Sequence, residues 1–490
     1  MATERIPLTQ PIESRTGSFA KDSYSSNCFF ETRDQKRELI KRPGLVLAKQ
    51  IVSITPPAST PSQGLIEFND KLIAVINDTI YQVDPSSSYA VTTLGTTSVS
   101  TSQSYFVKTF LDTYLFFHNK TTGYLYDQTG VSIAMTTLPT APYVSGAVFL
   151  DNYIFLATST NRIYNSAVGD PTSWGSLDYI TFEQTTDTLV GIAKHLNYLI
   201  AFGSISMQFF YDAANATGSP LALAPSYTSD IGCASGDSIV ATSNTVLWIG
   251  STKTNSRSVY ILDGVSATKI STSSIDRHLV ADNLSQVTAY CYTIDGHSLY
   301  ILTLHNTQKT LVYDLNERMW YTWTQYSIQS TGQPNAGTYQ ESYFRPSFFT
   351  TLSNIAYVLD DDTATLYYFD VDIYQDDGQD IYCRTVSDIM DNGTTKRKFY
   401  GRLEIIGDKV SSGTMQVRHT GDDYNNWSSY RSIDLNATRP QVYLSGADRR
   451  RAWEFLCTSN VPLRIDAAEV DFRIGEMDQE QAVGGGRYRR

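Results

Sequence analysis

The sequence predicts an all-β protein: a six- or seven-bladed β-propeller followed by a C-terminal β-sandwich. The first observation behind this prediction is composition, because 33 Tyr and 21 Phe among 490 residues, together with many Thr, Ser and Val, favour strands over helices. The second is an apolar motif that recurs along the chain. The third is that no segment sustains helical periodicity over three turns, which argues against an α/β fold.

The recurring motif is a polar turn followed by an apolar, aromatic run. "LDTYLFFHN" (residues 111–119) returns as "LDNYIFLAT" (150–158) and as "HLNYLIAFG" (195–203). The intervals between copies are roughly 40 to 56 residues, within or near the range of propeller blades. The copies centre on Leu72, Leu115, Ile154, Leu199, Leu247, Leu299 and Ile355.

Each copy reads as a β-hairpin. A second apolar strand follows most copies after a polar turn, as in "LYILTLHNTQKTLVYDL" (residues 299–315). Asp, Asn and Gly at the turns adopt backbone conformations that other residues resist. One blade cannot bury both of its faces alone, so radial packing of blades closes the core. Short strands at regular spacing also build sandwiches or elongated stacks of hairpins, and these remain alternatives.

Changes in composition divide the chain into four parts. Residues 1–49 form an N-terminal arm with the first strands, and residues 50–375 form the propeller. The turn-rich stretch "YQDDGQD" then introduces residues 376–476, whose alternating segments, such as "GRLEIIGD" and "GTMQVRHTG", predict the sandwich. Residues 477–490, which end in "GGGRYRR", are expected to be a flexible tail.

Charge and cysteine content restrict the class of protein. Residues 50–390 hold 13 basic and 30 acidic side chains, and an acidic surface of this kind repels phosphate. The five cysteines are widely spaced without a C-x-x-C pair, so free thiols are expected rather than disulfides or a zinc site. No apolar run approaches twenty residues, so no membrane span or membrane binding is predicted. The charged start "MATERIPLTQ" predicts no secretory signal.

Motifs for catalysis are weak throughout. "TGDDYNNW" (residues 420–427) is close to the S-x-D-x-G-x-x-W turn of sialidase propellers, with Tyr424 in place of Gly. The six histidines show no metal-binding spacing, and no phosphate-binding loop or nucleophile elbow is present. We therefore predict no catalytic residue, no cofactor and no metal ligand. Carboxylates of the type that glycoside hydrolysis uses are expected to lie in solvated turns: Asp360, Asp361, Asp362, Asp376, Asp377 and Asp380.

Two basic triplets stand out near the C-terminus. Lys396–Lys398 and Arg449–Arg451 could meet phosphate or an acidic partner. More often such triplets form a solvated rim.

One family resembles most of the chain. "NCFFETRDQKRELIKRPGLV", the strand "HLNYLIAFGSISMQFFYD" with the following "IGCAS", "MQVRHTGDDYNNWSSYR" and "VDFRIGE" are similar to segments of the packaged-DNA stabilisation proteins, or tail hub (nozzle) proteins, of short-tailed bacteriophages. The resemblance covers about residues 25–476, and the connections after Asp314 follow it less closely.

The resemblance implies a non-enzymatic structural role in the virion tail, with assembly in the bacterial host cytoplasm. Such proteins form a ring, usually of six copies, beneath the portal and its head-to-tail adaptor. They close the channel, retain packaged double-stranded DNA without sequence-specific binding, and carry tail spikes, fibres or a needle. Two alternatives remain: a glycan-active, sialidase-like tail enzyme, and a non-catalytic propeller that serves as an interaction platform.

Overall fold

The computed structural model describes residues 2–8, 12, 22–33, 36–55, 58–127, 132–183, 187–215, 217–254, 256–331, 335–443 and 446–475. The chain divides into two compact units. Residues 43–371 and 375–379 form one, called here the propeller unit. Residues 1–42, 372–374 and 380–490 form the other, called here the terminal unit. The expected tail at 477–490 lies outside the described residues.

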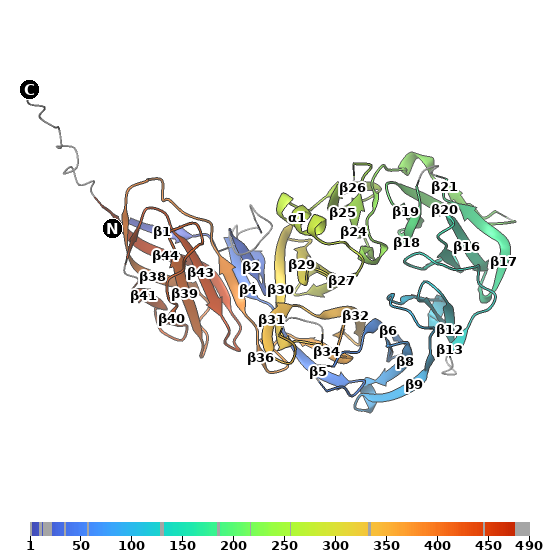
Figure 1. The fold of residues 1–490 in the computed structure, drawn as a ribbon, viewed down its shortest axis with the longest axis horizontal. Helices are drawn as coiled ribbons and strands as arrows, with labels where there is room; N and C mark the ends of the chain where they lie inside the picture. Colours follow the sequence, from blue (N-terminus) through green and yellow to red (C-terminus); the bar gives the residue numbers. More distant parts are fainter. Residues whose placement is uncertain are drawn as a thin grey trace, which may run out of the picture. The chain divides into compact units, whose positions relative to one another are not determined.

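The propeller unit is built from antiparallel sheets arranged around a central axis (Figure 1). Within the described residues there are seven such sheets, so the propeller has seven blades. The first three blades are β6 (Ser62–Phe68), β7 (Lys71–Ile76), β8 (Thr79–Asp84) and β9 (Ala90–Thr96); β10 (Tyr105–Lys108), β11 (Tyr114–His118), β12 (Gly123–Asp127) and β13 (Ser132–Ala134); and β14 (Val148–Leu150), β15 (Tyr153–Ala157), β16 (Arg162–Ala167) and β17 (Asp170–Thr181).

The next three blades follow in chain order. Helix α1 (Ser273–Ala281) connects the fifth blade to the sixth, and the Thr272 side chain caps its N-terminus. The fourth blade is β18 (Leu189–His195), β19 (Tyr198–Gly203), β20 (Met207–Asp212) and β21 (Leu221–Leu223). The fifth is β22 (Gly232–Cys233), β23 (Val240–Ala241), β24 (Val246–Ser251), β25 (Arg257–Asp263) and β26 (Ser266–Lys269). The sixth is β27 (Val287–Ile294), β28 (His297–Leu304), β29 (Lys309–Asp314) and β30 (Met319–Ile328), with β31 (Tyr339–Tyr343) on β30.

The seventh blade joins distant parts of the chain. Three of its strands are β32 (Pro346–Leu352), β33 (Ile355–Asp360) and β34 (Thr365–Asp370), and β5 (Gly44–Gln50) pairs antiparallel with β34 as the fourth. The short β35 (Gln375–Asp376) extends this sheet beyond β5. This pairing closes the ring, because a strand from the start of the propeller completes a blade made at its end.

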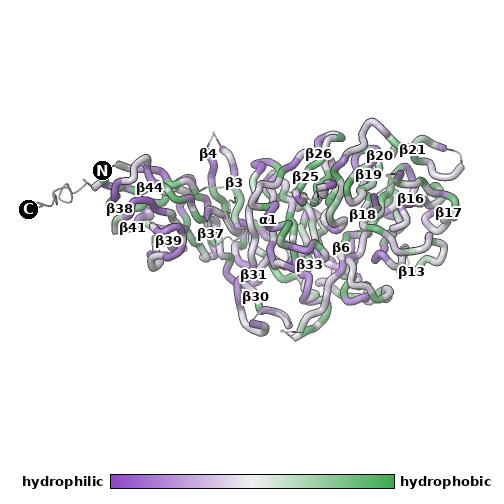
Figure 2. Tube along the Cα trace, turned by 45° about the horizontal axis from the view of Figure 1, so that its top comes forward, coloured by the Kyte–Doolittle hydropathy of each residue, from purple (hydrophilic) through white to green (hydrophobic). Residues whose placement is uncertain are grey.

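The repeat motif marks the second strand of every blade. Its seven centres lie in β7, β11, β15, β19, β24, β28 and β33, and all but Ile355 are buried. Hydrophobic residues accordingly follow the strands of the blades (Figure 2). The turns before these strands are left-handed, as at Asp151–Asn152 and Asn69–Asp70, which is the conformation that Asn and Asp tolerate. The all-β propeller predicted from the sequence is therefore confirmed.

The terminal unit holds two antiparallel sheets. The first has the order β3 (Cys28–Arg33), β4 (Lys36–Lys41), β44 (Arg464–Ile474), β38 (Lys398–Gly407) and β41 (Gln441–Tyr443), with β1 (Ala2–Ile6) on β44 and β42 (Ala447–Asp448) on β38. The second has the order β2 (Tyr24–Ser26), β37 (Cys383–Val386), β43 (Ala452–Cys457), β39 (Thr414–Thr420) and β40 (Arg431–Asp434). The rings of Tyr400 and Trp453 connect the two sheets at 5.7 Å. The sandwich at residues 376–476 stays a prediction.

The N-terminal residues differ from their expected place. Residues 1–42 belong to the same unit as residues 380–490, whereas the sequence suggested an N-terminal arm with the first strands over residues 1–49. The reason is strand pairing, since β1 and β4 both bind the long C-terminal strand β44, and β2 pairs with β37. Sequence composition alone does not reveal pairings between strands that lie more than 300 residues apart. No helix among the described residues is long and apolar enough to cross a membrane.

Candidate functional site

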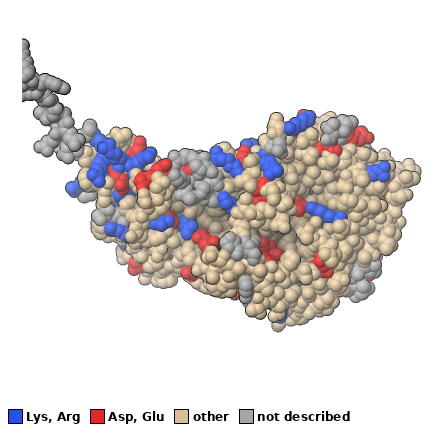
Figure 3. Space-filling model, in the orientation of Figure 1, with Lys and Arg blue, Asp and Glu red and all other residues tan. Residues whose placement is uncertain are grey.

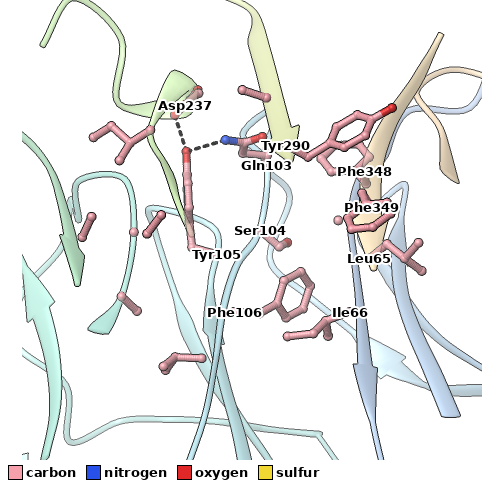
Figure 4. A pocket seen from close by; sticks show the side chains of 18 of the residues that line it. Leu65, Ile66, Gln103, Ser104, Tyr105, Phe106, Asp237, Tyr290, Phe348 and Phe349 are labelled. Atoms are coloured by element: carbon pink, nitrogen blue, oxygen red, sulfur yellow. Dashed lines mark hydrogen bonds between the residues drawn. The ribbon is translucent and has the colours of Figure 1, made fainter. Parts of the chain in front are cut away.

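The propeller encloses a cavity of about 790 Å³ at its centre. Each blade contributes residues from its innermost strand, as in β6, β10, β14 and β32, or from the segment beside that strand. Figure 4 shows Phe106 and Ile66 from two neighbouring blades and Tyr290 and Phe349 from two others, all beside the cavity. The volume is that of a pocket for a small molecule.

A polar cluster connects three blades across this cavity. Tyr105 on β10 hydrogen-bonds to Asp237 and accepts a hydrogen bond from Gln103 at 3.1 Å (Figure 4). Ser145, just before β14, donates to the same Asp237 oxygen at 2.7 Å, and the ammonium of Lys120 lies 2.7 Å from it. One oxygen of Asp237 therefore accepts hydrogen bonds from Tyr105, Ser145 and the Lys120 ammonium. Burial raises the pKa of Tyr105, so its hydroxyl stays protonated.

His118 supports this cluster from behind. Its ring stacks on Tyr105 at 5.1 Å, its Nε2 lies 3.0 Å from the Gly146 carbonyl oxygen, and its Nδ1 accepts from the Lys120 amide. Burial lowers the pKa of His118 to about 4, so the ring is neutral at physiological pH. Gly146 has φ +91°, and a Cβ there would lie 2.2 Å from the Ile192 carbonyl oxygen. The cluster thus holds blades together rather than presenting reactive groups.

The consecutive carboxylates lie at a turn, as expected, because Asp361 and Asp362 follow the end of β33 at Asp360. The turn is not fully solvated, however, since Asp360 is buried and Asp361 and Asp362 are partly buried. They gather around Arg345, whose side chain is 4 % exposed. Arg345 Nη2 lies 3.3 Å from Asp360 and 3.1 Å from Asp362, and its Nε lies 3.6 Å from Asp361. The antiparallel register that pairs Pro346 with Asp360 brings the arginine and the carboxylates together.

Asp361 is held by further partners. Tyr343 donates to it at 2.7 Å, and His305 Nδ1 lies 3.1 Å away. His305 and Arg345 lower the pKa of Asp361 although burial opposes this shift, so Asp361 remains ionised. A signal for this cluster was present in the sequence as an arginine placed fifteen residues before an acidic run across a hairpin.

The second acidic group is divided between the units. Asp376 and Asp377 belong to the propeller unit, whereas Asp380 belongs to the terminal unit. Asp376 is buried. Burial and the charge of Asp376 raise the pKa of Asp377. Both aspartates, with Asp360, line a cavity of about 210 Å³ beside Arg345.

The stretch "TGDDYNNW" folds as a tight turn in the terminal unit. Asp422 accepts hydrogen bonds from Thr420 and from the Asn426 amide at 2.9 Å, which lower its pKa to about 2. Tyr424 occupies the expected glycine position with φ +62°. It is retained there because its buried hydroxyl donates to the Ser387 carbonyl oxygen at 2.9 Å.

The basic triplets are not simply a solvated rim. The third member of each, Lys398 and Arg451, is buried, while Lys396, Arg397, Arg449 and Arg450 are exposed. Lys398 donates to the Arg449 carbonyl oxygen at 2.5 Å, so the structure brings both triplets into contact.

The cysteines are free thiols, as expected. Sequence spacing did not reveal that three of them meet in the terminal unit, where Cys383 lies opposite Cys457 in register and beside Cys28. Among the described residues no group of three or more His, Cys, Asp or Glu side chains is placed to hold a metal ion.

Comparison with known proteins identifies the family. The family model described as bacteriophage P22 Gp10, β-propeller, matches residues 5–374. No curated protein matches the chain. Similar solved structures include a chain of the mitotic checkpoint complex (11 % identity, TM-score 0.42, covering 68 % of this chain and 94 % of that one) and the WD40 propeller of Doa1 (8 %, 0.41, 67 % and 97 %).

A third similar structure is virginiamycin B lyase from Staphylococcus aureus (9 % identity, TM-score 0.41, covering 63 % of this chain and 94 % of that one). Such distant similarities do not bear on what this chain does. The family model, in contrast, spans most of the chain and all but the last strand of the propeller unit. The chain therefore belongs to the bacteriophage P22 Gp10 β-propeller family of phage DNA-stabilisation proteins and is a structural component of a phage virion.

Proposed function

We propose that this chain is the tail hub, or nozzle, subunit of a short-tailed phage. In this proposal six copies form a ring below the portal and its adaptor, close the DNA channel after packaging, and carry the tail spike, fibre or needle. Assembly takes place in the cytoplasm of the bacterial host. The observation that carries the proposal is the family match over residues 5–374.

The small size of the central cavity argues that DNA passes outside the propeller. The cavity has a volume of about 790 Å³, which is that of a pocket for a small molecule, and the Tyr105–Asp237 cluster crosses it. A DNA duplex does not fit there, because its major groove alone, about 12 Å wide and about 8.5 Å deep, is large enough to admit an α-helix. DNA therefore passes alongside the propeller, through a channel that several copies surround. The closed ring of blades provides a rigid wall for such a channel, since β5 fixes the last blade to the first part of the propeller.

The charge of the propeller suits such a wall. Residues 50–390 hold 30 acidic and 13 basic side chains. An acidic wall repels the phosphate backbone, so that DNA slides past it during ejection.

The test uses DNA-filled phage heads that carry portal and adaptor but lack this protein. Purified chain is added, DNA retention is measured by nuclease protection, and the vertex is imaged. We expect retained DNA and a ring with six-fold symmetry. Heads that continue to leak and show no added density would overturn the proposal, and hydrolysis of labelled bacterial surface glycan would then be assayed for the glycan-active alternative.

A further inference from the structure

The terminal unit presents a group of exposed cations, most of which the sequence showed only as two separate triplets. Lys396 and Arg397 precede β38, Arg449 and Arg450 follow β42, and these two strands pair with Lys398 opposite Asp448. Arg473, on β44, lies opposite Phe399 in the adjacent pairing. Figure 3 shows Lys and Arg side chains gathered over this part of the terminal unit. The name basic surface is used here for Lys396, Arg397, Arg449, Arg450 and Arg473.

Two buried cations fix the backbone beneath this surface. The Lys398 ammonium donates to the carbonyl oxygens of Thr394 at 2.6 Å, Lys396 at 3.2 Å and Arg449 at 2.5 Å. One side chain therefore ties both triplets together.

Arg451 is held in a different way. It is paired with Asp448, and its guanidinium lies 3.9 Å from the centre of the Tyr400 ring. The exposed residues next to these two anchors are thus carried on an ordered backbone.

The exposed cations of the basic surface have no acidic partner among the residues that the structure describes. None of the five makes an ion pair with those residues, whereas Arg402 and Arg439 of the same unit each do. Arg397 donates only to a backbone oxygen, that of Ala447 at 3.2 Å. Like charges held together repel one another, so a surface of this kind is more favourable once an anion covers it.

We propose that the basic surface binds the sugar-phosphate backbone of double-stranded DNA without reading its sequence. Four of its five cations are arginines, whose planar guanidinium matches phosphate through two parallel hydrogen bonds. Protein–protein interfaces have cores depleted of charge, whereas DNA interfaces are strongly positive, and cations dominate here. The choice of DNA as the anion rests on the proposed tail-hub function. The existence of the basic surface does not, because it follows from strand pairing and exposure.

The test measures binding of the purified full chain to a fluorescent 30-base-pair duplex of arbitrary sequence by anisotropy at several salt concentrations. If all five cations contact phosphates, the logarithm of the binding constant falls with the logarithm of salt with a slope of about −4.5. Doubling the salt from 50 to 100 mM then weakens binding about 20-fold.

The Arg397→Gln, Arg449→Gln, Arg450→Gln variant removes three of the contacts. Its slope is expected near −2, so that the same doubling weakens binding about 3- to 4-fold. The matched control replaces three exposed cations of the propeller unit, Lys253, Arg277 and Arg318, with Gln, and should keep the wild-type slope.

Three results would overturn the proposal. The wild type does not bind the duplex, the wild type and the triple variant show equal salt slopes, or the triple variant and its control lose equal amounts of duplex affinity. Polyglutamate that competes as well as unlabelled duplex would also overturn it, in favour of an acidic protein as partner. The head-complementation experiment separates the two proposals. A six-fold ring that retains DNA, formed by a chain that does not bind duplex, would leave the tail-hub function standing and remove only the DNA-binding surface.

Discussion

The propeller unit and the terminal unit both bury positively charged side chains, and two of these, Arg345 and Lys398, are satisfied in different ways. In the propeller, Arg345 faces three carboxylates from the neighbouring strand end. In the terminal unit, Lys398 donates to three backbone carbonyl oxygens. The first arrangement locks strands within a blade by charge pairing. The second uses a buried charge to hold two loops in place, and so supports an exposed surface for binding.

The largest effect should come from breaking the charge cluster of the propeller. Arg345→Met leaves Asp360 and Asp361 buried without their main counter-charge, and we expect a loss of about 3–5 kcal/mol in the free energy of unfolding. Urea-induced unfolding monitored by fluorescence measures it. The matched control is Arg439→Met in the terminal unit. Arg439 is more than half exposed and Glu404 keeps Arg402 as a second partner, so the expected loss is below about 1 kcal/mol. Equal losses of stability in both variants would show that burial does not decide how much an arginine ion pair contributes.

A second comparison uses one histidine from each unit, the buried His118 and the partly buried His419. Burial lowers the pKa of both His118 and His419 to about 4, below the ordinary value of about 6.5. The unfolded chain therefore binds protons that the folded chain does not, so stability is full above pH 6.5 and is lost as the pH falls toward 4. The fully buried His118 contributes a loss of about 3 kcal/mol over that range. His419 is only partly buried, so solvent screens its charge and its contribution is smaller.

The measurement is the free energy of unfolding as a function of pH for the wild type, His118→Gln and His419→Gln. Each variant should show a shallower decline between pH 6.5 and 4 than the wild type. Parallel profiles for all three proteins would rule out the two neutral histidines as the source of acid sensitivity.

The sequence predicted the architecture of the propeller because its determinants are local. Each blade repeats a turn of Asn, Asp or Gly before an apolar strand, and the seven motif centres fall in the seven second strands. What it did not predict depends on contacts between distant residues. The place of residues 1–42 follows from pairing of β1 with β44, and the burial of Asp360 follows from Arg345 across a hairpin.

The same distinction applies to the surfaces and sites. The triplets at 396–398 and 449–451 were visible as charge runs, but only the pairing of β38 with β42 turns them into one surface. The meeting of Cys28, Cys383 and Cys457 likewise depends on three strands that are far apart in the chain. Composition predicts that a cation is exposed on average. Whether a given cation is instead buried and hydrogen-bonded, as Lys398 is, depends on the residues that surround it in the fold.

A smaller effect is expected for the anchor of the basic surface. Lys398→Met removes three hydrogen bonds to backbone oxygens without leaving a paired carboxylate behind, and should lower the free energy of unfolding by about 1–3 kcal/mol. Because the loop that carries Arg449 loses its tie, DNA binding should weaken as well. Lys396→Met, at an exposed position two residues away, is the control for stability and should change it by less than about 0.5 kcal/mol. Unfolding in urea and duplex binding by anisotropy check the two effects.

The smallest effect, and the only stabilising one, comes from the left-handed turns. Leu111 in the propeller has φ +55° with its side chain 79 % exposed, so glycine relieves the left-handed strain and loses little packing. Leu111→Gly should therefore raise the free energy of unfolding by about 0.5–1 kcal/mol. Tyr424 in the terminal unit has a similar φ of +62° but is buried and bonded to Ser387. The same substitution there removes an aromatic core side chain and should destabilise the protein, by about 3 kcal/mol or more. Thermal unfolding of both variants measures the signs. If both substitutions shifted the midpoint in the same direction, backbone strain and side-chain burial would not be what distinguishes these two positions.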